Sequence, residues 1–574
     1  MRRAPHSFTR SGVPIVLLAA ALGGCAASTD DTAGTDAPLR IVLDQPSSGA
    51  FVEGRVLRVA GHVEGPARTV VIDGEAVDLD DQGRFDFRRD VEPGAHRVSL
   101  RASGGGDEVG TYAAAIVGDL RPSTERVTNA AAIELGPDAL AAIGAGASDL
   151  IGRQDVSALL AGRNPVVEGT WGHVNVTSLE HGPIEVSFRP DRGTLVVDVA
   201  IQALRIGLQV DTSITGAGSG ELTAMSARLS APLAIGMTEG HPDVALSGAT
   251  VGFDGFAFAL DGIPEVLENS NIVRDALRVQ LEERLSGMLA TMMPPYLQQT
   301  LATLPTSGEL DVAGAPIAYD ARIATLSVTP NGLSATVDLG VRAAAPLPGR
   351  ETFGTLRTDR GAPPVFAPHG VGLAVAVDAV NAAATAAWAA GKLNLDLPRV
   401  PFGERELTAG ALSLITNRVG RELGPEVPLS LAVRPGLPPV ARVAEGGIEI
   451  HLADVPLDMM ADTGDGAPMH LISLSAGVRV TIVPRVVDGA IGVEIRGLEI
   501  VMDPIDARVA EVEALEDIVH GVLLPRLAGM LDLGGLRIPS LRGFTIDAQH
   551  LSATAGYAQF QGAITYRPEA PAAE

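Results

Sequence analysis

Residue combinations that could catalyse a reaction are scarce in this chain. No H-E-x-x-H sequence is present, and Ser219 follows Ala217 at the position where a hydrolase nucleophile elbow has glycine. Asp462-Thr463-Gly464 matches the triplet of aspartic proteases but occurs once, whereas that chemistry needs two carboxylates that share a proton. The sequence therefore predicts a loop at this triplet and a protein that is not an enzyme.

Metal-binding patterns are equally weak. Asp78, Asp80 and Gly83 match the start of a calcium-binding loop. Gln82 and Arg89 occupy the fifth and twelfth positions, and the twelfth requires a bidentate glutamate, so a strand-joining turn is the better interpretation. The chain has one cysteine, which excludes a multi-cysteine metal site, and its 11 histidines show no ligand spacing. We expect no metal and no cofactor.

The single cysteine, Cys25, has chemistry of a different kind, as an acceptor of acyl groups. Arg2, Arg3 and Arg10 form a basic region, and residues 13–22 form an apolar stretch too short to span a bilayer. Leu22-Gly23-Gly24-Cys25 then resembles the lipobox of bacterial lipoproteins, in which the chain is cut before the cysteine and the thiol is acylated. The resemblance implies a signal peptide at residues 1–24 and lipid attachment at Cys25. The alternative is an ordinary secretory signal with an incidental cysteine.

The residues that follow Cys25 favour a tether. Residues 26–37 contain no large apolar side chain, which is typical of a flexible linker. Ala26 stands where lipoproteins kept at the inner membrane often have aspartate, so the lipobox resemblance implies a lipid-anchored place in the cell envelope, at the outer membrane. We expect the chain to be anchored to a bacterial membrane and not to cross it.

The composition indicates a large folded core that contains few rings. The 574 residues are 46% hydrophobic and only 3% aromatic, which argues against extended disorder. The formal net charge of −26 is unsuited to a phosphate-binding surface, so no nucleic-acid partner is expected.

Residues 38–118 alternate short apolar runs with turn signals such as Asp73-Gly74 and Pro93-Gly94. This pattern predicts a small all-β sandwich. It resembles bacterial immunoglobulin-like modules, which implies a spacer between the anchor and the rest of the chain.

Residues 119–345 and 346–574 form two halves in which the expected elements follow the same order. Arg284-Leu285-Ser286-Gly287-Met288-Leu289 recurs as Arg526-Leu527-Ala528-Gly529-Met530-Leu531, each near the end of an expected helix. The shared order of helix and strand indicates an internal duplication.

Each half combines a long expected helix with long expected strands, and both have one apolar face. Residues 263–293 place apolar side chains at steps of three or four, and residues 512–531 repeat this pattern. Residues 195–210 alternate with a period of two. Such a helix and sheet will pack together, and their small side chains leave either a cavity or a solid core between them.

The segment at residues 371–393 is the most specific sequence in the second half. It places Asn381 on an apolar helix and Trp388 in a small-residue turn before Gly391-Lys392-Leu393. In these features and in the order of its elements, the chain from about residue 120 to 568 resembles the tubular lipid-binding proteins typified by bactericidal/permeability-increasing protein (BPI) and cholesteryl ester transfer protein.

The resemblance implies a mixed α+β fold. The all-β immunoglobulin-like sandwich would be followed by two tandem helix-wrapped, strongly bent antiparallel sheets, arranged as a BPI-like boomerang. Each would bind a lipid or other long apolar ligand without acting chemically on it. The disulfide and the cationic tip of some family members are absent from this sequence.

The expected function is lipid binding or lipid transfer by a membrane-anchored protein. The alternative is a non-enzymatic structural or adhesion protein of the cell envelope, with a solid core and a protein partner. The candidate residues of the lipid-binding cavity are Val273, Leu277, Leu281, Leu285, Met288, Trp388, Val519, Leu523, Leu527 and Met530.

Overall fold

The computed structural model describes most of the chain after residue 37. The described residues are 38–47, 49–152, 164–165, 167–169, 172–212, 216–238, 241–261, 275, 278–283, 286–287, 290, 306–312, 315–350, 354–358, 360–366, 369–402, 405–416, 422–445, 447–464, 466, 468–487, 490–505, 512, 515–516, 521 and 543–567.

The N-terminal region consists of two sheets packed against each other. One sheet has the order β1-β3-β6, with β1 (Arg40–Gln45), β3 (Val56–Glu64) and β6 (Arg84–Asp90). The other has the order β2-β8-β7-β4-β5, with β2 (Ala50–Val52), β8 (Asp107–Val117), β7 (Gly94–Gly104), β4 (Thr69–Ile72) and β5 (Glu75–Asp78). Val59 and Phe87 of the first sheet join Val70 and Leu100 of the second in one buried cluster. Alternation in both sheets therefore gives a single apolar layer between them.

An eight-stranded antiparallel sheet follows, and two very long strands form its centre. The pair is β14 (Thr194–Thr212) and β15 (Gly216–Thr238), which are hydrogen-bonded from Leu195↔Leu233 to Thr212↔Gly216. The remaining strands are β11 (Val167–Gly169), β12 (Gly172–Glu180), β13 (Ile184–Asp191), β16 (His241–Leu246), β17 (Thr250–Asp254) and β18 (Ala257–Asp261).

A break in the pleat keeps one face of this sheet apolar along its length. Ala203 of β14 has a φ of 48°, in the left-handed region, and neither it nor the opposing residue takes part in the regular pairing. The β14 residues of the buried aliphatic cluster are odd-numbered before the break and even-numbered after it, and those of β15 change parity at the same level. The aliphatic side chains on both sides of the break therefore belong to one cluster.

A seven-stranded sheet joins segments that are far apart in the sequence. Its order is β19 (Ser307–Val312), β20 (Ala315–Thr329), β21 (Gly332–Ala343), β10 (Val127–Leu135), β23 (Val371–Ala376), β33 (Tyr557–Tyr566) and β32 (Phe544–Thr554). Helix α1 (Pro137–Gly152) lies against β13 and β33, and helix α5 (Val377–Ala389) lies against β21. The short pair β9 (Leu120–Arg121) and β22 (Thr355–Leu356) lies beside α5.

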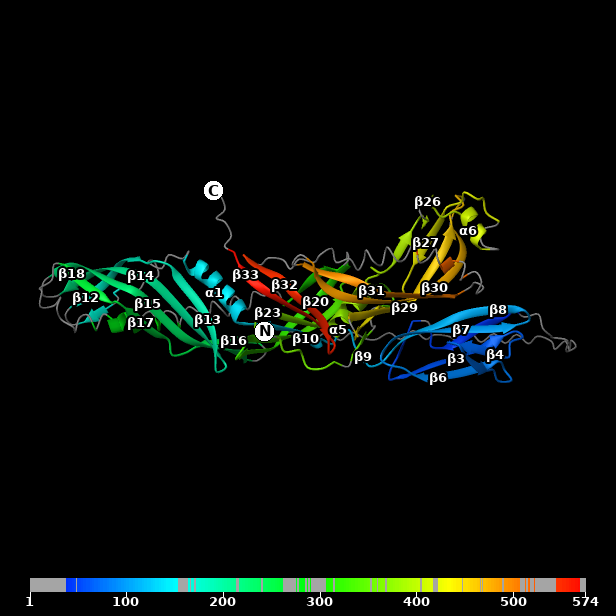
Figure 1. Cartoon of the computed structure of the whole chain (residues 1–574), viewed down its shortest axis with the longest axis horizontal. Helices are drawn as coiled ribbons and strands as arrows, with labels where there is room; N and C mark the ends of the chain where they lie inside the picture. The colour runs from blue at the N-terminus through cyan, green and yellow to red at the C-terminus, as the bar shows by residue number, and fades with distance from the viewer. Residues whose placement is uncertain are drawn as a thin grey trace, which may run out of the picture.

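A six-stranded sheet completes the body. Five of its strands follow the order β24 (Leu395–Leu397), β27 (Leu429–Val433), β29 (Gly447–Ala461), β30 (Met469–Val487) and β31 (Ala490–Pro504), and β28 (Val440–Ala444) pairs with β29. The hairpin β25 (Pro401–Phe402) and β26 (Arg405–Glu406) and helix α6 (Ala409–Ile415) lie at one end. Figure 1 shows an elongated molecule with the eight-stranded sheet at one end, the seven-stranded sheet in the middle, and the six-stranded and N-terminal sheets at the other end.

The predicted mixed α+β, helix-wrapped boomerang is wrong, because the described residues are nearly all β. Strands hold 64% of them and helices 12%. Helices α1, α5 and α6 have 16, 13 and 7 residues. The long helices predicted at residues 263–293 and 512–531 fall largely outside the described residues, although residues 278–283 are helical. The error arose because extended strands of small and aliphatic residues were expected to need long helical partners, whereas other strands also pack on these faces, as Val328 of β20 and Leu333 of β21 do on the eight-stranded sheet.

Candidate functional site

The inner face of the eight-stranded sheet is a continuous aliphatic surface. Every inward position of β14 from Leu195 to Val210 is leucine, isoleucine or valine, and this run spans about 50 Å at about 3.3 Å per residue. β12 and β15 extend the surface on either side of β14. Its deeply buried members, each at most 4% exposed, include Val174, Val176, Leu204, Ile206, Leu208, Val210, Leu222 and Ala224. Such a surface can bind apolar groups and offers no acid, base or nucleophile.

Helical segments cover part of this face. Leu281, in the helical residues 278–283, is 1% exposed and belongs to the aliphatic cluster. The Ser286 hydroxyl donates a hydrogen bond to the carbonyl oxygen of Ala249 at 3.0 Å, which ties the segment to the sheet. Helix α1 packs closely on β13, because a Cβ on Gly144 would lie only 2.4 Å from the carbonyl oxygen of Val186. The aliphatic face is therefore interior.

Of the predicted cavity residues, the structure describes Leu281 and Trp388, and only Leu281 belongs to the aliphatic cluster of the eight-stranded sheet. Trp388 lies in the last turn of α5, not in a turn after it, and is 1% exposed. Its indole N–H donates to the carbonyl oxygen of Pro435 at 2.7 Å, and the Arg350 guanidinium lies 4.2 Å from the ring centroid. The other predicted residues lie outside the described residues: Val273, Leu277, Leu285, Met288, Val519, Leu523, Leu527 and Met530, together with Cys25.

The sheet residues of this candidate site were not among the predicted cavity residues. Leu204, Ile206 and Leu208 were recognisable as an alternating strand, but alternation also describes an ordinary core strand. The sequence feature that could have identified them is the change at Ala203 from apolar residues at odd-numbered positions to apolar residues at even-numbered positions. In an uninterrupted strand, one of these two apolar runs would face outward.

One described cluster contains the residue types of a hydrolase triad but not its geometry. The Ser473 hydroxyl donates to Oδ1 of Asp458 at 2.5 Å, and Nε2 of His470 lies 2.8 Å from the same hydroxyl oxygen. With the serine proton directed at the carboxylate, the imidazole contributes a donor and not a base. A triad requires the imidazole to accept the serine proton and the carboxylate to orient the imidazole. This cluster does not match that arrangement.

Two further findings concern only the described residues. No group of three or more histidine, cysteine, aspartate or glutamate side chains is placed to hold a metal ion. No described helix is both long enough and apolar enough to cross a membrane.

No protein-family model matches the chain, and no curated protein matches its sequence. Among solved structures, it is similar to a lipopolysaccharide binding protein, with a TM-score of 0.44 and 15% identity, over 77% of this chain and 100% of that one. It is also similar to P47 of Clostridium botulinum E1, with a TM-score of 0.27 and 7% identity, over 76% of this chain and 100% of that one. At these values the likenesses carry no conclusion about function.

Proposed function

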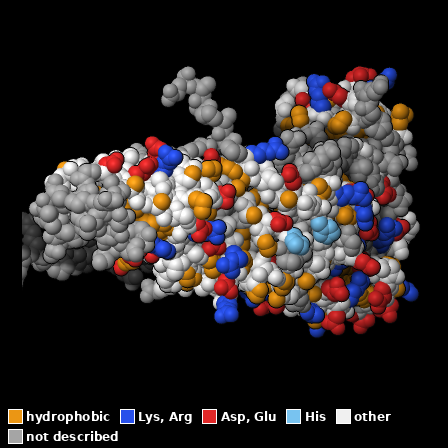
Figure 2. All heavy atoms as spheres, turned by 60° about the vertical axis from the view of Figure 1, so that its left-hand side comes forward, with side chains coloured by type: hydrophobic (Ala, Val, Ile, Leu, Met, Phe, Trp, Pro, Cys, Tyr) orange, Lys and Arg blue, Asp and Glu red, His pale blue; other side chains and the backbone are white. Residues whose placement is uncertain are grey.

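We propose that the chain is a lipid-binding protein that holds an acyl chain or a similar long apolar group against the inner face of the eight-stranded sheet. The observation that carries the proposal is the unbroken aliphatic run on β14, continued on β12 and β15. On the face that Figure 2 presents, hydrophobic side chains are interspersed with charged ones.

The physical basis of binding would be the hydrophobic effect. Each CH₂ group of an acyl chain gains about 0.8 kcal/mol on leaving water, so an extended chain profits from an extended apolar surface. The leucine, isoleucine and valine side chains of the sheet impose little directional preference. The ligand would therefore be selected by shape and apolarity and released unchanged, without catalysis.

The proposal includes attachment to a bacterial envelope through acyl groups on Cys25. The motif Leu22-Gly23-Gly24-Cys25 and the polar residues 26–37 support it. Acylation would hold the binding body beside the membrane that contains its ligands.

The test is the lipid content of the purified protein. Residues 26–574, exported behind an ordinary secretory signal and purified without detergent, are expected to release lipid on organic extraction, in a near-constant molar ratio measured by mass spectrometry. The protein should also take up a fluorescent fatty acid after delipidation. A chain that is folded by circular dichroism but releases no lipid and takes up none contradicts the proposal.

A further inference from the structure

The N-terminal sheets dock firmly on the six-stranded sheet through one buried arginine. Arg97 of β7 donates through Nε to Oδ2 of Asp503 at 2.8 Å, and both side chains are 6% exposed. Gly477 leaves room for it, since a Cβ there would lie 2.6 Å from Cδ of Arg97. The guanidinium also lies 4.0 Å from the ring centroid of Tyr112, whose hydroxyl donates to Asp454 at 2.7 Å. The N-terminal region is thus fixed to the body through buried polar contacts.

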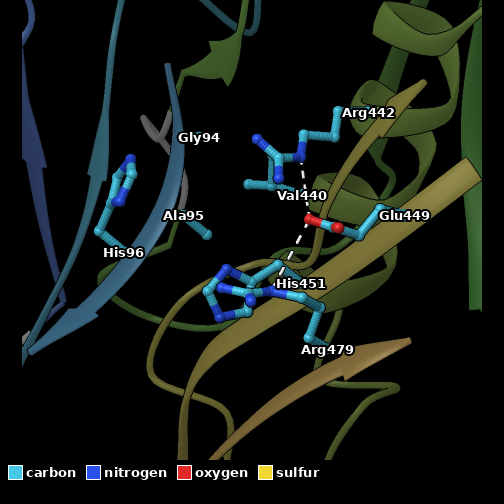
Figure 3. Close-up of a pocket in the computed structure, with 8 residues that line it drawn as sticks. All are labelled: Gly94, Ala95, His96, Val440, Arg442, Glu449, His451 and Arg479. Carbon is cyan, nitrogen blue, oxygen red and sulfur yellow. Dashed lines mark hydrogen bonds and ion pairs between the residues drawn. The ribbon is translucent and has the colours of Figure 1, made fainter. Parts of the chain in front are cut away.

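A small cavity lies at another part of the same interface, with a histidine on each side. His96 comes from β7 and His451 from β29, and the cavity of about 60 Å³ has room for water but not for a lipid (Figure 3). Its other lining residues are Gly94, Ala95, Val440, Arg442, Glu449 and Arg479. Both imidazoles therefore lie where the two parts of the molecule meet.

The charged groups around the cavity leave little compensation for a charged imidazole. Glu449, with its side chain 14% exposed, pairs with Arg442 at 2.9 Å and with Arg479 at 3.8 Å. The exposed Glu92 and Glu499 pair with the same arginines, at 3.3 and 3.1 Å. These three carboxylates are thus already engaged by arginines.

The two histidines are consequently poor proton acceptors. Burial, and next the Arg479 charge, lower the pKa of His451 from its ordinary 6.5 to about 4. Burial likewise lowers the pKa of His96, and the charges of Arg442, Arg479 and Arg89 lower it further. Nε2 of His96 donates a hydrogen bond to the carbonyl oxygen of Glu92 at 2.6 Å, which offsets part of this lowering.

We propose that His96 and His451 form an acid-sensitive latch, in which protonation of the imidazoles in the cavity loosens the N-terminal sheets from the six-stranded sheet. An imidazolium at His96 would face Arg442 and Arg479 across the interface. An imidazolium at His451 would lie beside Arg479 on its own sheet, where the two residues are paired, and closed off from water by β7. Separation of the two parts would let water solvate all these cations.

The sign of the effect follows from proton uptake. A histidine whose pKa is lowered in the docked state binds a proton more readily in the open state, so docking weakens as the pH falls below 6.5 and the loss levels off near 4. With pKa values of about 4 and 6.5, His451 alone shifts the docking equilibrium about thirtyfold at pH 5.

Asp454 acts in the opposite direction. Burial raises the pKa of its carboxyl, so protonation in acid favours the docked state. The shift of the docking equilibrium at pH 5 should therefore be smaller than the contribution of the histidines alone. The substitution Asp454→Asn should make this shift larger.

Thiol labelling of a buried cysteine measures the opening. Ala114→Cys, at an interface position 3% exposed, is introduced into the full chain that carries Cys25→Ser, so that the new thiol is the only one. Its labelling rate, divided by the rate in the unfolded chain at the same pH, should rise at least about tenfold from pH 7.5 to 5. Ala227→Cys, buried in the eight-stranded sheet, should show no such rise.

Histidine variants test whether His96 and His451 cause the opening in acid. In His96→Gln/His451→Gln the rise should disappear, whereas it should persist in His62→Gln, whose histidine lies on β3 away from the cavity. The proposal is overturned by a rate ratio near one in the parent chain, by an equal rise at Ala227→Cys, or by a rise that survives the double histidine substitution.

Discussion

Replacing Asp378 by alanine is expected to lower the free energy of unfolding by about 3–5 kcal/mol. Asp378 lies in the first turn of α5 and is fully buried. It accepts hydrogen bonds from Arg121 at 2.9 Å and from the backbone N–H of Thr358 at 2.9 Å. Its loss would leave the buried Arg121 guanidinium without its counter-charge. Chemical unfolding followed by intrinsic fluorescence, to which Trp388 of the same helix contributes, measures the change.

The matched control is Asp396→Ala. Asp396 also pairs with an arginine, Arg434, but its side chain is 71% exposed, so its removal should cost less than about 1 kcal/mol. Equal losses in the two variants would show that burial of the Asp378 pair does not govern its contribution.

Replacing Ala224 by phenylalanine should remove most of the bound lipid, with a loss of about tenfold or more. Ala224 of β15 is 4% exposed on the inner face and is paired with Leu204 in the middle of the sheet. The added ring would occupy space that the ligand fills, so the free energy of unfolding of the empty protein should change by less than about 1 kcal/mol. Overpacking a solid core would instead cost about 1–3 kcal/mol. Lipid extraction and chemical unfolding of the same preparation separate these results.

Thr223→Phe is the control for this substitution. It adds a ring to the neighbouring residue, which pairs with Arg205 and Ala257 and faces the other side of the sheet. Its lipid content should equal that of the parent chain. A destabilised Ala224→Phe protein with an unchanged lipid content would favour a solid core with no ligand.

The strands at residues 195–210 were predictable because their pattern is local. Leu195 to Ile201 and Leu204 to Val210 each alternate with a period of two, and both form β14. The helix at Asn381 was also predictable from its run of alanines, and Asn381 bonds through both amide atoms to Ala441. Gly391, with a φ of 75°, lies just beyond the helix.

The buried ion pairs could not be predicted, because their partners are distant in the sequence. Arg121 and Asp378 are 257 residues apart, and Arg97 and Asp503 are 406 apart. A lone aspartate within the apolar segment 371–393 was the available signal, since a carboxylate is buried only with a partner. The sequence did not indicate which arginine that partner would be.

The predicted share of helix is too high for the described residues, of which strands hold 64% and helices 12%. Strand pairing over many residues, as between β29 and β30, supplies the packing that long helices were expected to provide. Strands form because they pair with other segments of the chain, and the pattern of residues within one segment does not reveal its partners.

Photolabelling tests the central claim most directly, because it reports where a lipid is held. A fatty acid with a photoreactive diazirine on its chain is bound to the delipidated protein and irradiated, and the labelled peptides are identified by mass spectrometry. We predict labels on β12, β14 and β15, at inward residues such as Ile206 and Leu222, and their loss in Ala224→Phe. Labels confined to other parts of the chain, or the absence of any specific label, would contradict the account.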